Sequence, residues 1–329
     1  MTDQSQLFPG KHFISTVLDA LETKTAMSGG LARVYLMRAA MAGGLIGIMY
    51  LTNYTILAAF AGVGDGSLVD IGKIVGALVF GFALVFIYYS KSELLTSNMM
   101  IVAIGAYYRR TTFWRSTRIL LMCYGGNIIG GLGVALIVLG SSLGDGAVGE
   151  QLQAGADHKL EYVAEGLSGW SDLFLRAVLC NFMINLAMLL VYNGLIKDDF
   201  TKSLVMIMSV FVFAFVGFEH SVANTVLFTI VGLKDGIDIG LALGNLGIVL
   251  VGNFIGGGLL IGYYYAYAND DRKFLRRQSR RGPQFTPPLV EGESVQSAEG
   301  AADAVDDSTD VSTADSSTDV RTTDAPEDK

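Results

Sequence analysis

The chain has 329 residues, of which 51% are hydrophobic and only 16% are charged. This composition is too apolar for a soluble domain of this size, and the apolar residues occur in runs of about 20, the length of a transmembrane helix. It excludes a soluble enzyme or binding module and predicts an all-α integral membrane protein. The sequence contains no nucleotide-binding loop, no metal-ligand cluster and no nucleophile with a nearby base, so we expect no enzymatic activity, no cofactor and no nucleic-acid partner.

The net charge of −8 is unevenly distributed along the chain. Residues 291–329 hold 12 acidic and 2 basic residues, so this stretch carries −10 and the rest of the chain +2. The stretch has no aromatic residue and cannot bury enough surface to fold alone. We therefore predict a basic and then acidic disordered tail over 273–329, with a partner-binding role as the alternative. The polar residues 1–30 are expected to form a cytoplasmic segment, without a cleavable signal peptide.

Between these ends the sequence predicts a six-span transmembrane domain over residues 31–272. The expected spans are 34–61, 69–108, 117–140, 173–195, 203–232 and 239–268. With six crossings, the basic clusters near residues 33–38, 109–118, 197–202 and 272–281 all fall on one side of the bilayer. The positive-inside rule then predicts a multi-pass plasma-membrane protein with both termini in the cytoplasm.

The second and fifth spans are each interrupted by a polar stretch. A helix of 40 residues would rise about 60 Å, twice the hydrocarbon thickness, so residues 69–108 cannot be one straight helix. SKSELLTSN (90–98) interrupts this span, and GFEHSVAN (217–224) interrupts the fifth. Irregular backbone at membrane depth is tolerated only where it is buried in protein or lines a cavity, so the two breaks predict a binding site or pore.

A shift of 126 residues aligns the two breaks. It places Glu93 on Glu219 and Asn98 on Asn224, and it superimposes GNIIGG (126–131) on GNFIGG (252–257). Three spans per half is an odd number, so the second half is inverted relative to the first, and the site is expected at the interface of this 3+3 repeat. The glycines permit close helix contact, and Asn127 and Asn253 are expected to hydrogen-bond between helices or to the breaks.

His220 is the residue in these breaks that carries the sharpest functional signal. A lone histidine on an apolar span is ordinarily a core residue satisfied by one hydrogen bond, but the mirrored break favours a functional position. Glu93, Asn98, Glu219 and Asn224 are more simply explained as a structural clasp that holds each break in shape.

KSELLTSNMM, AVLCNFMINLA, GFEHSVANTV and GNFIGGGLL occur in the order found in the formate/nitrite transporter family, which the chain resembles over about residues 15–270. The resemblance implies an aquaporin-like fold that lacks the aquaporin NPA signature, and a homopentamer with one pore per protomer. It implies that the substrates are small monovalent anions of weak acids, such as formate, nitrite, hydrosulfide, acetate or lactate.

The resemblance also assigns roles to individual residues. His220 matches the central pore histidine, Asn181 the asparagine near it, and Thr96 the threonine on the first break. The apolar constrictions match Phe80 with Leu84 on one side, and Leu94 with Phe213 on the other.

These assignments fit elementary electrostatics. A dry apolar ring excludes an anion but admits the neutral acid. A histidine between two such rings, with an ordinary pKa of about 6.5, can donate a proton to the anion or assist it electrostatically.

One position departs from the family pattern. Where the family commonly has a vestibule lysine, sixteen residues before the pore asparagine, this chain has Glu165. Either the loop is offset and Lys159 takes that place, or the protein depends less on vestibule attraction, or its substrate differs. Two rival functions also remain open at the level of sequence: a neutral small-solute channel for water or ammonia, and a membrane scaffold that acts through its acidic tail.

Overall fold

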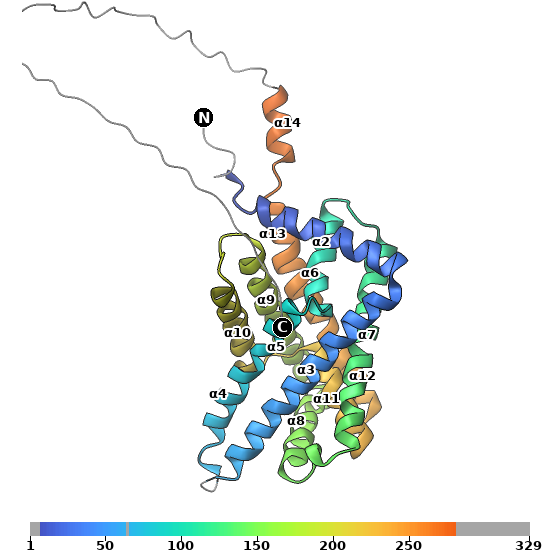
Figure 1. Ribbon diagram of the computed structural model, residues 1–329, viewed down its shortest axis with the longest axis vertical. Coiled ribbons are helices and arrows are strands. Elements are labelled where there is room, and N and C mark those ends of the chain that lie inside the picture. The colour runs from blue at the N-terminus through green and yellow to red at the C-terminus, as the bar shows by residue number, and fades with distance from the viewer. Residues whose placement is uncertain (1–6, 64–65, 281–329) are drawn as a thin grey trace, which may run out of the picture. The chain divides into compact units, whose positions relative to one another are not determined.

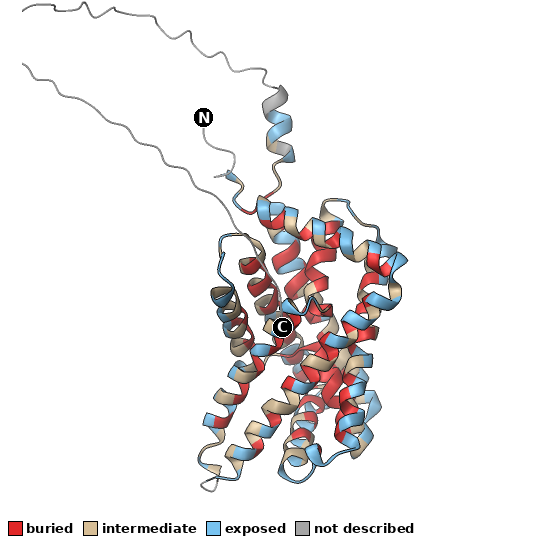
Figure 2. Ribbon diagram, in the orientation of Figure 1, coloured by how far each residue is buried: buried red, intermediate tan, exposed pale blue. Residues whose placement is uncertain are grey.

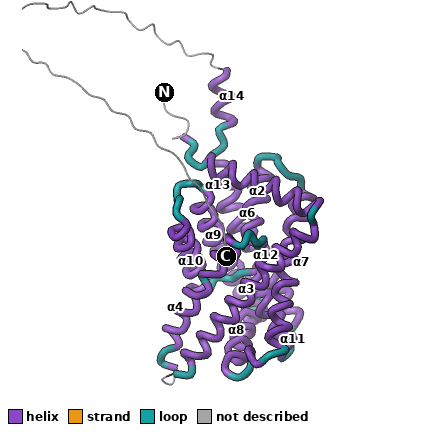
Figure 3. The backbone as a smooth tube through the Cα atoms, in the orientation of Figure 1, coloured by secondary structure: helices purple, strands orange, loops and turns teal. Residues whose placement is uncertain are grey.

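The computed structural model describes residues 7–63 and 66–280, and these residues are entirely helical apart from their connecting turns (Figures 1 and 3). Six helices in this part of the chain are long and apolar enough to cross a membrane. They span Ala32–Ala61, Val69–Tyr89, Phe113–Leu139, Leu167–Tyr192, Asp199–Val216 and Ile239–Ala268, which confirms the predicted all-α six-span architecture.

The first half of the chain consists of one polar helix, three spans and a short return helix. The elements are α2 (Lys11–Gly30), α3 (Ala32–Ala61), α4 (Val69–Phe80), α5 (Phe82–Tyr89), α6 (Leu95–Tyr107) and α7 (Phe113–Leu139). The predicted second span is thus a crossing, α4 and α5, followed after the break by the short helix α6.

The second half repeats this order. Its elements are the single-turn η2 (Ser142–Gly144), α8 (Ala147–Ala164), α9 (Leu167–Tyr192), α10 (Asp199–Val216), α11 (Ser221–Lys234), α12 (Ile239–Asn253), the π-helix η3 (Phe254–Tyr263), α13 (Tyr264–Ala268) and α14 (Arg272–Arg280). Asp198 and Asp238 begin α10 and α12 as N-caps, because each carboxylate accepts a backbone N–H three residues ahead.

Glycines allow the helices of each half to pack closely. α3 packs along α7, and α9 packs against α12 and η3. A Cβ on Gly130 would lie 1.8 Å from the carbonyl oxygen of Ala40, and a Cβ on Gly256 would lie 2.0 Å from that of Val178. Only glycine fits at these two positions, which accounts for the repeated glycine motif.

Three segments outside the expected spans have more regular structure than the sequence indicated. Residues 11–30 form helix α2, and its Phe13, Val17 and Leu21 are buried in the same core as the spans rather than in a separate segment. Residues 147–164, which lie between the expected third and fourth spans, form the helix α8. The first residues of the predicted disordered tail continue helix α14 as far as Arg280; the acidic part of that tail lies outside the described residues.

Buried residues concentrate where the helices of the two halves meet (Figure 2). The short helices α6 and α11 are buried along most of their length, and so are the residues that lead directly into them, 93–94 and 219–220. This arrangement brings the polar residues of both breaks into the core.

Candidate functional site

An asparagine on α7 holds the first break. The Asn127 side chain accepts the N–H of Leu95 at 3.1 Å and donates to the carbonyl oxygens of Ala39 and Glu93 at 2.8 and 2.9 Å. It therefore satisfies the N–H of Leu95 and the carbonyl oxygen of Glu93, which the break leaves without helical partners, and ties them to α3.

Asn253 repeats these bonds in the second half. It accepts the N–H of Ser221 at 3.0 Å and donates to the carbonyl oxygens of Ala177 and Glu219 at 2.8 and 2.9 Å. The offset of 126 residues between Asn127 and Asn253 is the one that the sequence revealed. The inverted repeat is therefore present at the level of single hydrogen bonds.

A carboxylate and an amide bridge each break. Asn98 donates to Glu93 at 3.1 Å, and Asn224 donates to Glu219 at 2.6 Å. All four side chains are buried. The geometry matches the clasp proposed from the sequence, since each pair ties the start of the break to the helix that follows it.

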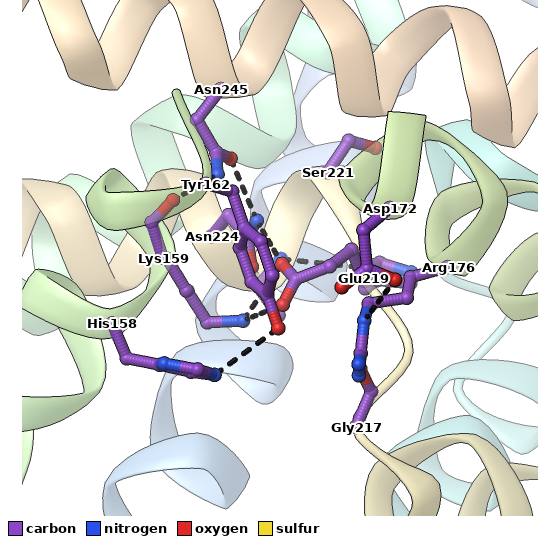
Figure 4. Close-up of polar contacts among 12 residues, drawn as sticks. His158, Lys159, Tyr162, Asp172, Arg176, Gly217, Glu219, Ser221, Asn224 and Asn245 are labelled. Atoms are coloured by element: carbon purple, nitrogen blue, oxygen red, sulfur yellow. Dashed lines mark hydrogen bonds and ion pairs between the residues drawn. The ribbon is translucent and has the colours of Figure 1, made fainter. Parts of the chain in front are cut away.

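A lysine from a neighbouring helix neutralises each clasp carboxylate. On α8, the ammonium of Lys159 contacts both oxygens of Glu219 at 2.7 and 2.8 Å (Figure 4). On α2, Lys24 pairs with Glu93. Burial is the largest single influence on the pKa of Lys159 and lowers it, but Glu219, with Tyr54 and Tyr162, raises that pKa overall, so this lysine stays charged.

The two candidates for a vestibule residue lie in different surroundings. Lys159 is buried in the Glu219 clasp, where Asn245 also holds its carbonyl oxygen at 2.8 Å. Glu165 is exposed and ends helix α8. Of the two, Lys159 lines a cavity that leads to His220, and Glu165 does not.

Two cavities enter the core from opposite clasps. The Lys24 vestibule, of about 240 Å³, is lined by Lys24, Arg38, Lys91, Glu93 and neighbouring residues. The Lys159 vestibule, of about 200 Å³, is lined by Lys159, Arg176, Glu219, His220 and their neighbours. A chamber of about 10 Å³ separates them, and its lining is apolar except for His220.

The four predicted constriction residues all line this chamber, but they pair differently from the prediction. Phe80 and Phe213 contact each other, with ring centroids 6.0 Å apart, and both also line the Lys159 vestibule. Leu84 and Leu94 line the Lys24 vestibule. Phe80 and Leu84 are one helical turn apart, about 6 Å along the helix axis, so they face different ends of the chamber.

His220 forms the N-cap of α11. Its Nδ1 accepts the backbone N–H of Ala223 at 3.1 Å, and its Nε2 lies 3.3 Å from Oγ1 of Thr96 on the other break. The ring stacks on Phe213, with centroids 6.0 Å apart. Because Nδ1 accepts a hydrogen bond, the neutral ring carries its proton on Nε2, the atom that points to Thr96.

Asn181 lies beside this pair but its amide is already engaged. Its Nδ2 donates to the carbonyl oxygens of Asn253 and Thr96 at 2.7 and 3.1 Å, and its Oδ1 accepts from Asn185 at 2.7 Å. The structure therefore places Asn181 as a support for both breaks, one layer behind Thr96.

The sequence profile of the formate/nitrite transporter family matches residues 11–267. The chain belongs to the formate/nitrite transporter family. Members of this family are channels and transporters rather than enzymes. With its six apolar helices, the chain is a multi-pass membrane protein.

Individual relatives are distant. The chain is 33% identical over 201 residues to an uncharacterized transporter, YwcJ, of Bacillus subtilis, which covers 60% of this chain and 75% of that protein. It is 29% identical over 252 residues to the formate channel FocA of Haemophilus influenzae (69% and 83%) and 27% identical over 240 residues to the nitrite transporter NirC of Salmonella typhimurium (71% and 83%).

Solved structures confirm the fold of this family member. An FNT family ion channel is 24% identical, with a TM-score of 0.68 over 78% of this chain and 99% of that chain. A pentameric formate channel with formate bound is 23% identical, with a TM-score of 0.57 over 72% and 96%.

Several residues that line the chamber and the two vestibules were not identified from the sequence. Lys24 was missed because it lies on a polar helix 69 residues before its partner Glu93, and nothing local signals the contact. The available signal was symmetry: Lys159 lies 60 residues before Glu219 in the second half. The chamber residues Ile46, Ile87, Ile184 and Val210 resemble ordinary packing residues.

Proposed function

We propose that this protein carries small monovalent weak-acid anions, such as formate or nitrite, across the plasma membrane. The observation that carries the proposal is a single imidazole in an apolar chamber of about 10 Å³ between two vestibules lined with cations. The formate channel and nitrite transporter among its relatives support the same substrate class.

The dimensions of the chamber explain how such a pore would select. A space of about 10 Å³ holds roughly one water molecule, so an anion sheds most of its hydration on entry. Charge in a dry apolar ring is costly, and the neutral acid avoids that cost. Vestibule cations without a carboxylate partner concentrate the anion, and the chamber favours its protonated or hydrogen-bonded form.

The surroundings of His220 suit a role as a hydrogen-bond donor to the substrate better than a role as a proton donor. In the neutral ring, Nε2–H points towards Thr96 and can donate to a substrate oxygen that lies between the two side chains, while Thr96 Oγ1 can accept the acidic proton of the neutral acid. Protonating Nδ1 would set its new N–H against that of Ala223 and break the N-cap bond. We therefore infer that the proton which neutralises the anion comes from water in the vestibule, and that His220 polarises the substrate during passage.

We further propose a homopentamer with one pore per protomer and with the Lys24 vestibule facing the cytoplasm. The pentameric formate channel among the structural neighbours supports the assembly. The basic clusters predicted to lie on one side of the membrane support the orientation. A native mass of about five times the 35.2 kDa chain tests the oligomer.

The test of function is radiolabelled formate and nitrite flux in proteoliposomes at two pH values, with His220→Ala and His220→Asn. Asparagine is a good N-cap, so His220→Asn keeps the α11 cap, whereas His220→Ala loses about 1 kcal/mol of stability. We expect faster wild-type flux at acidic pH, and in both variants a lower flux at each of the two pH values, because the hydrogen bond from the imidazole to the substrate is lost.

Three outcomes would contradict the proposal, and each would point to a different conclusion. If water or ammonia permeates the wild-type protein and no weak acid does, the protein is a neutral-solute channel. If no solute permeates the wild-type protein, the result supports the alternative of a membrane scaffold. A flux in His220→Asn equal to that of the wild type at both pH values would exclude the imidazole as a participant and leave only its capping role.

A further inference from the structure

The two halves of the inverted repeat differ at one position where the backbone has a positive φ: the second half has a glycine there and the first half does not. In the second half, α10 ends at Gly217 with φ +82°, and the N–H of Phe218 bonds back to the carbonyl oxygen of Phe213 at 2.9 Å. This is the left-handed helix ending that glycine adopts without steric penalty.

In the first half, a lysine adopts the same backbone conformation. Lys91, which lies 126 residues before Gly217, has φ +55°, and the N–H of Ser92 bonds back to the carbonyl oxygen of Ile87 at 3.0 Å. A left-handed conformation is unfavourable for a side chain other than glycine, asparagine or aspartate. A residue held there against its preference at a pore mouth suggests that its side chain has a function.

The side chain of Lys91 lies where a cation would matter. It lines the Lys24 vestibule, and its ammonium lies 4.9 Å from the ring centroid of Tyr88. Arg38 lines the same vestibule and donates a hydrogen bond to the sulfur of Met27. Within the described part of the chain, neither cation has a carboxylate at ion-pair distance.

The charge balance of the two vestibules is therefore unequal. In the Lys159 vestibule, Lys159 pairs with Glu219 and Arg176 pairs with Asp172 at 3.0 Å. In the Lys24 vestibule, the Lys24 charge is cancelled by Glu93, which leaves Arg38 and Lys91 as two uncompensated positive charges. The lysines of the two clasps are thus neutralised, and the net attraction for an anion comes from other residues.

We propose that Lys91 and Arg38 form a capture site for the substrate anion at the mouth of the Lys24 vestibule, a site without an equivalent at the opposite mouth. This inference rests on the proposed anion transport. The pair raises the local concentration of a small monovalent anion before it reaches the apolar chamber. It acts through its charge, so its effect falls as salt screens the mouth.

The experiment measures radiolabelled formate flux of the full-length protein in proteoliposomes at about 0.01 M and about 1 M inert salt, where the Debye length falls from about 30 Å to about 3 Å. Lys91→Gly removes the charge and suits the left-handed backbone. Because a unit charge about 6 Å from an anion in water changes its local concentration about threefold, we expect flux about threefold lower at low salt and unchanged at high salt. Lys91→Arg retains the wild-type rate, and Arg38→Gln shows the same salt-dependent loss.

Two controls separate charge from structure. Arg33→Ala removes an exposed charge from the same helix as Arg38 at a position outside the vestibule, and we expect no change in flux. Lys91→Gly relieves the backbone, so its Tm should rise by about 2–4 °C while its low-salt flux falls. A structural defect would lower both.

Three results would overturn the inference. Wild-type flux in Lys91→Gly at low salt would show that the charge does nothing. An equal loss at both salt concentrations would show a structural defect instead. If wild-type protein carries no weak acid at either salt concentration, the proposed function fails and the capture site fails with it, whereas the first two results leave the proposed function intact.

Discussion

Glu219 is tolerated in the core because each of its oxygens has a partner. Lys159 contacts both oxygens, and Asn224 donates to one of them. Asn224 in turn donates to Asn245, whose amide holds the backbone of Lys159 (Figure 4). The carboxylate, the ammonium and the two amides form one closed set of contacts. If one of the two charged groups is removed, the other is left buried without an opposite charge.

At the residue scale we therefore expect strong coupling between Lys159 and Glu219. Lys159→Met leaves Glu219 buried and unpaired and should destabilise the protein by about 3–5 kcal/mol, whereas Lys159→Met with Glu219→Gln should cost clearly less. Thermal unfolding in detergent measures both. Glu165→Gln, at an exposed carboxylate on the same helix, is the control and should change stability by under about 0.5 kcal/mol. A double variant no better than the single one would contradict the coupling.

Each break is a helix start that depends on one distant asparagine. The first N–H of α6 and the first N–H of α11 have no helical acceptor and bond instead to Asn127 and Asn253. The same two side chains also satisfy carbonyl oxygens on two other segments. The breaks therefore keep their shape because α7 and α12 hold them in place.

At the element scale, Asn253→Ala should destabilise the protein by about 2–4 kcal/mol, because it leaves the buried N–H of Ser221 and the carbonyl oxygen of Glu219 without their partner and removes the bond to Ala177. Asn127→Ala should cost a similar amount, since its bonds are the same. Asn193→Ala removes a single exposed bond, to the N–H of Leu195, and is the matched control. Tm values of Asn253→Ala and Asn193→Ala that fall together would refute this role.

At the scale of the whole molecule, the repeating unit is larger than the three spans that hydropathy detects. α2 and α8 occupy equivalent places, since each supplies the lysine that pairs with a clasp carboxylate. The sequence predicted the spans and breaks because apolar length and a constant offset are local or periodic signals. It could not predict α2 and α8, because their contacts join residues 60 or more positions apart and their polar faces resemble those of solvent-exposed segments. Nor could it pair Phe80 with Phe213, because that depends on how α4 and α10 are rotated about their axes.

We accordingly expect α2 to be required for the fold. Deleting residues 1–30 removes Lys24, leaves the buried Glu93 unpaired and uncovers the core around Phe13, Val17 and Leu21. The protein should lose thermal stability and formate flux. Lys24→Met in the intact chain separates the charge from the packing and should show a smaller loss of stability. A deletion variant with wild-type Tm would show that α2 is dispensable.

The mirrored halves also bear on which way solute moves. Because one half is the other turned upside down, a molecule approaching from either side meets the same order of clasp, apolar ring, histidine-lined chamber and ring. The backbone alone therefore sets no preferred direction of transport. If the proposed pore is passive, the direction of net flux follows the substrate concentrations on its two sides, and a difference such as Lys91 against Gly217 changes the rate of flux without setting its direction.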